Sequence, residues 1–280
     1  MDSFCARGKF RFKSSTVTVP ERLPISVCII AGNEAARIRR ALASVAEWTD
    51  EIILVINDDV NDGTDKIAEA FGARVFREPW KGHIAQKNSV AQKAGREWIL
   101  GLDADEEVSP ALRDEIRQLF SLPERLRSHQ AFSFPRCSFY CGRWIRHGDW
   151  YPDRKVRLWR RGRGEWGGID PHDAVMVDGA VGRLRSDLLH YTMENLNHHL
   201  RKVANYSDIF ARQKSGRKVG LAELWFRPWW RFVRGFLLRL GFLDGWQGYA
   251  VARLASLETF LRYAKIREAQ LPPDQSPTGQ

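Results

Sequence analysis

The sequence predicts an α/β fold, with a mostly parallel sheet flanked by helices and a helical C-terminal appendage. Short apolar runs alternate with helical patterns through the N-terminal half of the chain, as in doubly wound sheets. These runs lack polar alternation, which is typical of strands buried on both faces. Beyond residue 191 apolar residues recur at helical spacing, which indicates helices.

The predicted elements of the first half follow one another as four strand–helix pairs. The strands are expected at 25–30, 51–56, 73–76 and 98–102, and the helices at 34–46, 62–71, 83–95 and 110–120. From 131 to 189, short aromatic segments alternate with Gly, Arg and Pro, which indicates an irregular, strand-rich insertion.

Helical patterns dominate the rest of the chain. Leu196, Leu200, Val203 and Phe210 keep helical spacing, and a last helix is expected over 244–266. That helix would carry three leucines on one face, namely Leu254, Leu257 and Leu261. The chain therefore divides into a flexible tail (1–22), an α/β domain (23–190), a helical region (191–270) and a disordered tail (271–280).

Composition limits the possible partners. Lysine and arginine outnumber the acids 44 to 34, a formal charge of +10, which favours nucleic acid, an anionic bilayer or a phosphorylated substrate. The four cysteines do not form a disulfide framework at this length, so free thiols in a cytoplasmic protein are expected. No signal peptide or spanning helix is visible. We therefore expect a protein of the cytoplasm.

An acidic pair follows the fourth predicted strand. Asp103 and Asp105 end an apolar run, and two such close carboxylates repel unless a cation lies between them, which suggests a hard divalent metal. The alternative is a solvated acidic loop before the next helix, with Ser109 as N-cap and Pro110 as its first residue.

Polar residues also follow the other strands, and ligands bind at the carboxyl ends of strands in an open parallel sheet. Asn and Asp can recognise a base and ribose, while the Asp pair and Lys87 can serve a diphosphate. Neither a Walker loop nor a dinucleotide glycine fingerprint occurs. Nucleic acid fits poorly, because acidic strand ends repel a phosphate backbone. The strand-end residues are Ala31, Asn33, Glu34, Asn57, Asp103 and Asp105.

An ordered series of short motifs resembles the family-2 inverting glycosyltransferases. More narrowly, it is similar to the bacterial lipopolysaccharide core enzymes that add glucose to inner-core heptose. The likeness covers roughly residues 23–265. Its motifs begin at Ile29, Asp50, Asp62, Trp80, Gln86, Leu102, Trp150, Arg157, Trp166, Pro171, Leu189 and Gly241.

The resemblance implies a GT-A fold, a nucleotide-sugar donor and Mg²⁺ or Mn²⁺. Ala31, Asn33 and Glu34 would line the nucleoside pocket. Asn57 stands where the family usually has an Asp that reads the base, and an amide can still donate and accept hydrogen bonds. Lys87 would lie near the base or diphosphate.

The resemblance also implies a metal centre. Asp105 would be the main protein ligand of the metal, and Asp103 would reach the ribose or the metal-bound shell. His190 is a candidate further metal ligand, although a packed histidine is the alternative. The metal would stabilise the departing diphosphate as a Lewis acid.

Inverting transfer also needs a base near the acceptor hydroxyl. The resemblance favours Asp173, because related enzymes carry a His–acid pair where this chain has His172-Asp173. A polar loop pair that only supports the structure is the alternative. Glu106 and Asp170 are the reserve candidates.

Residues 131–190 would form the acceptor side of the domain. Arginine can contact phosphates and aromatic faces can pack on sugar rings, although ordinary packing on a basic face is the alternative. The candidates are Trp150, Arg157, Trp166 and His172, with Trp159, Arg160 and Arg161 beside them.

Residues 224–243 interleave large aromatics with four arginines. Pro228 can open a helix, after which Trp229, Phe232, Val233 and Phe236 share a face. Such a helix can lie in the headgroup region of an anionic membrane. The alternative is packing against the catalytic domain or a second subunit.

The sequence thus predicts a metal-dependent glycosyltransferase on the cytoplasmic face of the inner membrane. It would move a hexose, with glucose favoured, from a UDP-linked donor to an inner-core sugar of a lipid-linked oligosaccharide. One alternative is transfer to a polyprenyl phosphate or another surface glycan. Another is a non-catalytic, membrane-docking protein of the same fold.

Overall fold

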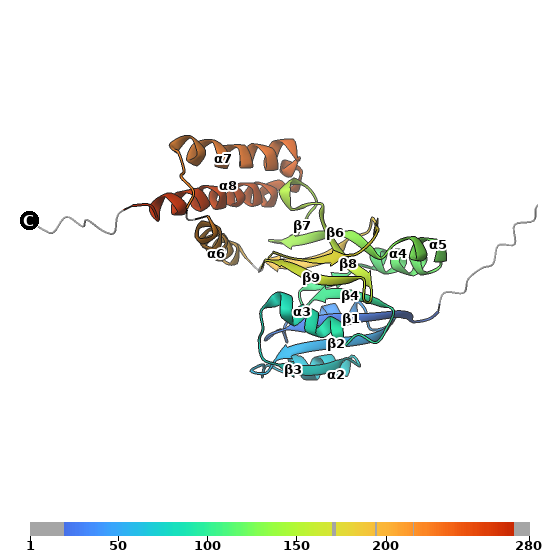
Figure 1. Ribbon diagram of the computed structural model, residues 1–280. Helices are drawn as coiled ribbons and strands as arrows, with labels where there is room; N and C mark the ends of the chain where they lie inside the picture. Colours follow the sequence, from blue (N-terminus) through green and yellow to red (C-terminus); the bar gives the residue numbers. More distant parts are fainter. Residues whose placement is uncertain (1–19, 170–171, 194, 215, 272–280) are drawn as a thin grey trace, which may run out of the picture.

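The computed structural model describes residues 20–169, 172–193, 195–214 and 216–271. In these residues a ten-stranded sheet forms the centre of the molecule, and the last helices lie to one side of it (Figure 1). The predicted N-terminal tail and the last nine residues lie outside the described residues, apart from Pro20, Glu21 and Arg22.

The strands form two sheets, one of ten strands and one of two. The order β3-β2-β1-β4-β8-β6-β12-β5 forms the sheet, β7 and β11 pair with β6, and β9 and β10 form a separate hairpin. The strands are β1 (Leu23–Ala31), β2 (Thr49–Asn57), β3 (Arg74–Glu78), β4 (Trp98–Asp103), β5 (Glu106–Val108), β6 (Ala131–Tyr140), β7 (Arg143–Ile145), β8 (Asp153–Arg160), β9 (Gly164–Ile169), β10 (His172–Val177), β11 (Val181–Arg183) and β12 (Leu188–Met193).

Helices cover the sheet and complete the C-terminal region (Figure 1). The α-helices are α1 (Ile38–Ala43), α2 (Thr64–Ala70), α3 (His83–Gln92), α4 (Pro110–Phe120), α5 (Pro123–Ser128), α6 (Leu196–Gln213), α7 (Leu221–Val233) and α8 (Gly245–Glu268). Shorter turns are η1 (Gly148–Trp150), the π-helical η2 (Arg234–Leu238) and η3 (Gly241–Asp244).

The predicted α/β class is confirmed. The four strands predicted in the first half are β1 to β4, and all their mutual pairings are parallel. Strand β8 then pairs antiparallel with β4, with Trp98 opposite Arg160. Because β8 runs the opposite way, its start lies at the edge where β1, β2 and β4 end.

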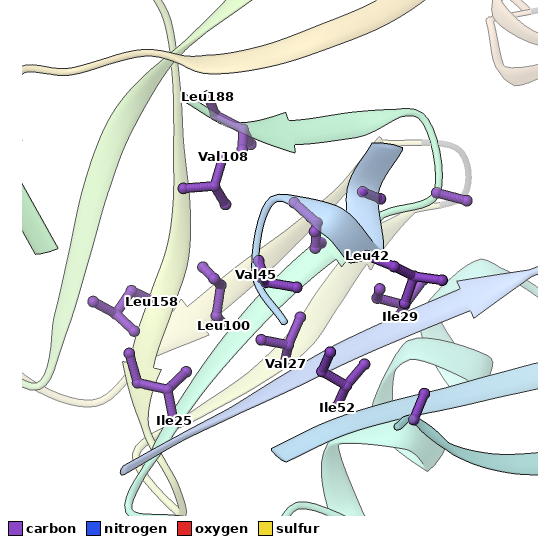
Figure 2. Packing of buried hydrophobic residues seen from close by; sticks show 14 of the residues in the cluster. Ile25, Val27, Ile29, Leu42, Val45, Ile52, Leu100, Val108, Leu158 and Leu188 are labelled. Carbon is purple, nitrogen blue, oxygen red and sulfur yellow. The ribbon is translucent and has the colours of Figure 1, made fainter. Parts of the chain in front are cut away.

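The sheet is packed on both faces, as the uninterrupted apolar strands predict. Side chains alternate along β1. Ile25, Val27 and Ile29 face one buried cluster that includes Leu42 of α1 (Figure 2). Cys28 faces the other cluster, together with residues of α3 and the β9–β10 hairpin.

Helix α1 begins four residues later than predicted. The loop after β1 is held instead by the Asp62-Gly63-Thr64 segment. The backbone N–H of Glu34 donates to Thr64 Oγ1 (3.0 Å), and that of Ala35 donates to Asp62 Oδ2 (2.9 Å). These long-range bonds hold the backbone of the strand-end residues outside the helix.

Ser109 and Pro110 are the N-cap and first residue of α4, as the loop interpretation of the acidic segment predicts. The backbone N–H of Leu112 donates to Ser109 Oγ (3.1 Å). Capping of α4 and a functional role for the preceding aspartates are therefore compatible.

The start of α6 and the place of Pro228 differ from prediction. Helix α6 begins at Leu196, since β12 continues to Met193 past the expected domain boundary at 190. Pro228 lies inside α7 and does not open it; its carbonyl accepts a hydrogen bond from Ser256 Oγ of α8 (2.8 Å). Contact with α8 thus stabilises the turn of α7 in which proline lacks a backbone hydrogen-bond donor.

Helix α8 is most deeply buried at Gly248, Val251, Ala252, Ser256, Tyr263 and Ile266, while Leu254 and Leu261 of the predicted leucine face are half-buried. Leu257 is exposed, whereas Ala252 and Ser256 are buried. A Cβ at Gly248 would lie 1.9 Å from the carbonyl oxygen of Gly241. Only a glycine allows this close backbone approach, and the approach seats η3 against α8.

One buried carboxylate ties these helices to the sheet. Asp244 is 2% exposed and accepts hydrogen bonds from the backbone N–H groups of Arg146 (2.9 Å) and His147 (2.7 Å). The ring Nδ1 of His147 lies 3.1 Å from its other oxygen. The start of α8 is thereby fixed to the segment that follows β7.

A buried histidine on α6 should make stability pH-dependent. His199 packs against Tyr140, with its Nδ1 3.0 Å from the phenol oxygen, and burial, followed by the nearby Lys202 and His198, lowers its pKa from 6.5 to about 4. The unfolded chain therefore binds more protons between these values, so the free energy of unfolding should fall as pH drops from 6.5 towards 4.

Urea unfolding at pH 7.5 and pH 5 would measure this fall. In His199→Gln, which can still bond Tyr140 but does not titrate, the drop should be smaller than in the wild-type protein. An equal drop in both proteins would assign the pH dependence to other groups.

No helix within the described ranges has the length and apolarity needed to cross a bilayer.

Candidate active site

A cavity of about 940 Å³ opens at the carboxyl ends of β1, β2 and β4. Its wall includes strand-end residues far apart in the sequence, namely Ala31, Glu34, Asn57, Asp103 and Asp105. Asn33, predicted to line the nucleoside pocket, is exposed and does not line this cavity. Its neighbours Gly32 and Glu34 line the cavity instead.

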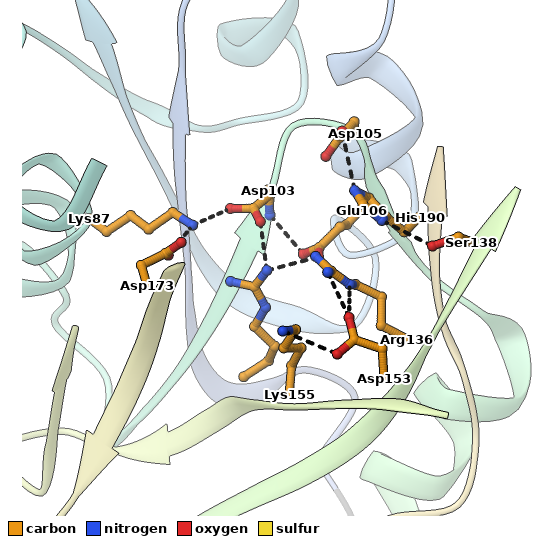
Figure 3. A network of polar contacts seen from close by, with 11 residues as sticks. Lys87, Asp103, Asp105, Glu106, Arg136, Ser138, Asp153, Lys155, Asp173 and His190 are labelled. Carbon is orange, nitrogen blue, oxygen red and sulfur yellow. Dashed lines mark hydrogen bonds and ion pairs between the residues drawn. The ribbon is translucent and has the colours of Figure 1, made fainter. Parts of the chain in front are cut away.

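Asp103 lies between two cations (Figure 3). Lys87 Nζ of α3 is 2.8 Å from its Oδ1, and Arg157 Nη2 of β8 is 2.6 Å from its Oδ2. Burial opposes the charge of this carboxylate, but Arg157 and Lys87 outweigh burial and hold its pKa well below the usual range. Asp103 is therefore a charged anchor for two basic side chains. Both of its oxygens are engaged by these cations, and its predicted role beside the metal stays a prediction.

Glu106 is the centre of a second ionic cluster. It is 1% exposed, and its Oε1 lies 2.8 Å from Arg157 and 3.3 Å from Arg136 of β6. Its Oε2 accepts from the backbone N–H of Asp103 (3.0 Å). Glu106, a reserve candidate for the base, is thus buried and fully engaged, so it positions the arginines and does not fit the role of a base.

Asp105 and His190 of β12 lie next to each other on the cavity wall. Oδ2 of Asp105 lies 3.4 Å from Nε2 of His190, while Ser138 Oγ lies 3.4 Å from the other ring nitrogen. Burial opposes ionisation of Asp105, but His190 and Lys202 outweigh it and lower its pKa. The carboxylate and the ring nitrogen are chemically suited to a divalent cation.

The predicted three-residue metal centre is not assembled. Among residues with described positions, no group of three His, Cys, Asp or Glu side chains could hold a metal ion. Asp105 and His190 fit as a pair of protein ligands, and a cation held there would need further oxygen ligands from a bound substrate or water. Asp103 lies on the same cavity, where it contacts Lys87 and Arg157.

Asp173 of β10 lies on the cavity wall opposite Asp105 (Figure 3). Its Oδ2 is 2.7 Å from Lys87 Nζ, which therefore bridges Asp103 and Asp173. Trp166 of β9 packs beneath this bridge, with Lys87 Nζ 4.4 Å from its ring centroid. The hairpin brings residue 173 within reach of a lysine 86 positions earlier in the chain.

The predicted acceptor residues have different surroundings. Trp166 lines the cavity but is 5% exposed, and its ring packs on Trp159, so it supports Lys87 and Arg157 more than it offers a face to a sugar. Trp150 packs on Tyr140 and His199 and lines a separate, smaller cavity. The side chain of His172 and the whole of Asp170 lie outside the described residues.

Arg157 is the one predicted arginine on the cavity wall. It is 4% exposed, and its Nε and Nη1 have no hydrogen-bond partner among the described residues. Arg160 and Arg161 bond to the carbonyls of Leu126 and Arg96. They lie at the opposite edge of the sheet, because β8 runs antiparallel to β4 and ends beside Trp98.

Sequence reasoning missed several cavity residues. Trp80 is 49% exposed, and its ring contacts His83 at a centroid distance of 4.8 Å; its motif was noted, but no role followed from it. Other missed residues include Arg136, Lys155, Lys202 and Tyr206, which come from β6, β8 and α6. Their local sequence carries no signal for this site, because the antiparallel half of the sheet and the C-terminal helices place them there.

Comparison with known proteins gives consistent matches. Residues 26–185 match the family described as Glycosyl transferase family 2. An uncharacterized glycosyltransferase of Rickettsia prowazekii is 31% identical, with 88% of each chain covered. The lipopolysaccharide core biosynthesis glycosyltransferase LpsC of Rhizobium meliloti is 26% identical, covering 88% of this chain and 92% of that protein.

Among solved structures, S. aureus TarS 1–349 in complex with UDP-GlcNAc aligns over 88% of this chain and 92% of that one. Its TM-score is 0.48 and its sequence identity is 13%.

Proposed function

Because the chain belongs to glycosyl transferase family 2, we propose that it transfers glucose from UDP-glucose to an inner-core sugar of lipopolysaccharide. Its α/β sheet with C-terminal helices agrees with the GT-A fold expected of that family. The observation that carries the proposal is the meeting of Asn57, Lys87, Asp105 and Asp173 on one cavity. The similarity to LpsC supports the choice of acceptor.

The donor half of the cavity would hold the nucleotide. Asn57 at the end of β2 can donate and accept hydrogen bonds with a base. Trp80 offers an exposed ring at the cavity wall. Lys87 and the unpartnered nitrogens of Arg157 supply positive charge for a diphosphate.

Asp105 and His190 are the side chains that would hold Mg²⁺ or Mn²⁺. The cation would supply Lewis-acid neutralisation of the leaving diphosphate. Lys87 lies on the same cavity and would add a second positive charge to that leaving group.

Asp173 would act as the general base. Its carboxylate takes the proton of the acceptor hydroxyl, and the acceptor oxygen forms a bond to the anomeric carbon. The bond from that carbon to the diphosphate oxygen breaks, and UDP leaves with the electron pair. The configuration at the anomeric carbon inverts, because attack and departure occur on opposite faces.

The proposal can be tested with the full chain, Mn²⁺, a panel of UDP- and GDP-sugars, and lipopolysaccharide truncated at its inner-core heptose. We expect metal-dependent release of UDP from UDP-glucose and a product heavier by one hexose. Transfer to a polyprenyl phosphate alone would contradict the proposed lipopolysaccharide acceptor. If no donor released its nucleotide, the proposed transferase activity would be contradicted.

We also propose that helices α7 and α8 rest on an anionic membrane. Trp225, Trp229 and Trp246 are 80%, 51% and 60% exposed. Phe232 and Phe236 stack near Tyr249, which extends the aromatic face between the two helices. Exposed apolar surface of this kind marks an interaction site, and a lipid-linked acceptor makes a bilayer the fitting partner.

Replacing Trp225, Trp229 and Trp246 by serine should release the protein from phosphatidylglycerol-containing vesicles. If each ring buries about 100 Å² at about 25 cal/mol per Å², it contributes about 2.5 kcal/mol, so the triple change should reduce binding below detection. Vesicle sedimentation measures this, with Trp80→Ser as the matched control on the α/β domain. Unchanged sedimentation of the triple variant would make this face structural.

A further inference from the structure

Three neighbouring cavities lie between the active site and the C-terminal helices, and each shares lining residues with the next. The active-site cavity shares Arg136, Lys202 and Tyr206 with a neighbour of about 250 Å³. That neighbour shares Arg231 and Glu258 with a groove of about 620 Å³ between α7 and α8. The groove therefore lies next to the active site, on the side of the C-terminal helices.

The groove is amphiphilic. Phe226 and Trp230 of α7 and Tyr263 of α8 supply apolar walls. Its lining also contains four arginines and two glutamates, namely Arg227, Arg231, Arg234, Arg262, Glu223 and Glu258. Positive charge is therefore in excess on a partly apolar surface.

The excess is greatest around Asp149. This carboxylate is 5% exposed and lies 3.2 Å from each of Arg231, Arg234 and Arg239. One negative charge thus faces three positive ones. Burial, together with repulsion from Arg234 and Arg262, lowers the pKa of Arg231 despite the attraction of Asp149. A bound anion would relieve this repulsion.

Two of these arginines do not face outward as the amphipathic-helix interpretation predicts. Arg231 and Arg234 line the groove and contact Asp149. Their role is therefore distinct from that of Trp225 and Trp229, which are exposed on α7 and do not line the groove.

We propose that the groove between α7 and α8 binds the phosphorylated, lipid-proximal part of the acceptor. Phosphate groups would lie on Arg231 and Arg234, and apolar parts of the same molecule would lie on Phe226 and Trp230. The acceptor would then run through the smaller cavity to present its terminal sugar near Asp173. This inference rests on the proposed transferase function and adds the position and chemistry of the anchoring end.

The test uses the full chain and neutral phosphatidylcholine nanodiscs that carry heptose-terminated lipopolysaccharide. Arg231→Gln and Arg234→Gln each remove one groove cation, while Arg239→Gln removes a cation that contacts the same Asp149 but does not line the groove. We expect each groove variant to weaken binding and raise the KM for this acceptor about tenfold, because a charged hydrogen bond is lost. Arg239→Gln should change both by less than about threefold.

Two further acceptors identify the recognised chemistry. Dephosphorylated lipopolysaccharide should bind the wild-type protein about as weakly as the intact form binds the variants. Phosphatidylglycerol nanodiscs of equal charge should bind the wild-type protein and the two groove variants equally well, because that binding is expected to use Trp225, Trp229 and Trp246. If the groove variants lost phosphatidylglycerol binding as much as lipopolysaccharide binding, the proposal would be overturned in favour of a general anionic surface. If a groove variant fails to fold, Ala222→Trp narrows the groove without removing an arginine and should weaken binding.

The outcomes separate the two proposals. Binding that depends on Arg231 and Arg234 without any sugar transfer would support the groove and contradict the proposed function. Transfer with the same acceptor KM in wild-type and groove variants would support the function and overturn the groove.

Discussion

Replacing Asp105 by alanine is expected to abolish metal-dependent binding of the sugar nucleotide and to reduce transfer by about a thousandfold. Asp105 is the carboxylate that faces His190 Nε2, at 3.4 Å. Its loss would leave one protein ligand for the cation, and Lewis-acid stabilisation of a leaving group is worth several kcal/mol. A loss of about 4 kcal/mol corresponds to the stated factor.

Titration of UDP with and without Mn²⁺ measures the effect directly. Asp58→Ala is the matched control, since Asp58 is an exposed carboxylate just after β2 that does not line the cavity. It should behave as the wild-type protein does. If Asp105→Ala keeps its Mn²⁺-dependent affinity for UDP, the ligand role of Asp105 is refuted.

Asp173→Asn is expected to lower the rate of transfer by about 10²–10⁴-fold, the usual contribution of a general base. An amide cannot take the acceptor proton at neutral pH, yet it keeps the shape of the side chain and can still accept a hydrogen bond from Lys87. Binding of UDP-glucose should therefore change little. The expected result is a loss in kcat with a near-normal Kd for the donor.

Single-turnover transfer and donor titration separate these two effects. Ser138→Ala is a suitable comparison, because Ser138 contacts His190 from outside the active-site cavity and should lower transfer far less. Near-normal turnover of Asp173→Asn would exclude this carboxylate as the base.

The parallel half of the sheet could be predicted because its signals are local. β1, β2 and β4 each contain an uninterrupted apolar run, and the residues that follow these runs lie at one edge by topology alone. Thus Ala31, Asn57 and Asp105 meet on one cavity as expected. The start of α1 could not be predicted, because it depends on side chains of residues 62 and 64.

The antiparallel half could not be derived in this way. Arg136 reaches Glu106 because β6 pairs with β8 and β12, and such pairing depends on contacts distant in sequence. The buried state of Glu106 also has no local signal, since a third acid after an acidic pair looks like a solvated loop. Sequence patterns therefore identified Asp105 and Lys87 but gave no sign of the ionic cluster that holds Asp103.

The attachment of α8 through Asp244 bears on the distance between the active-site cavity and any membrane that the C-terminal helices contact. Three hydrogen bonds or ion contacts join this carboxylate to residues 146 and 147, so the start of α8 is held directly against the segment that follows β7. If the protein rests on a bilayer as proposed, this attachment would hold the cavity that contains Asp105 and Asp173 at a set height above the lipid. Such an enzyme would favour glycans whose growing end stands at that distance from the membrane.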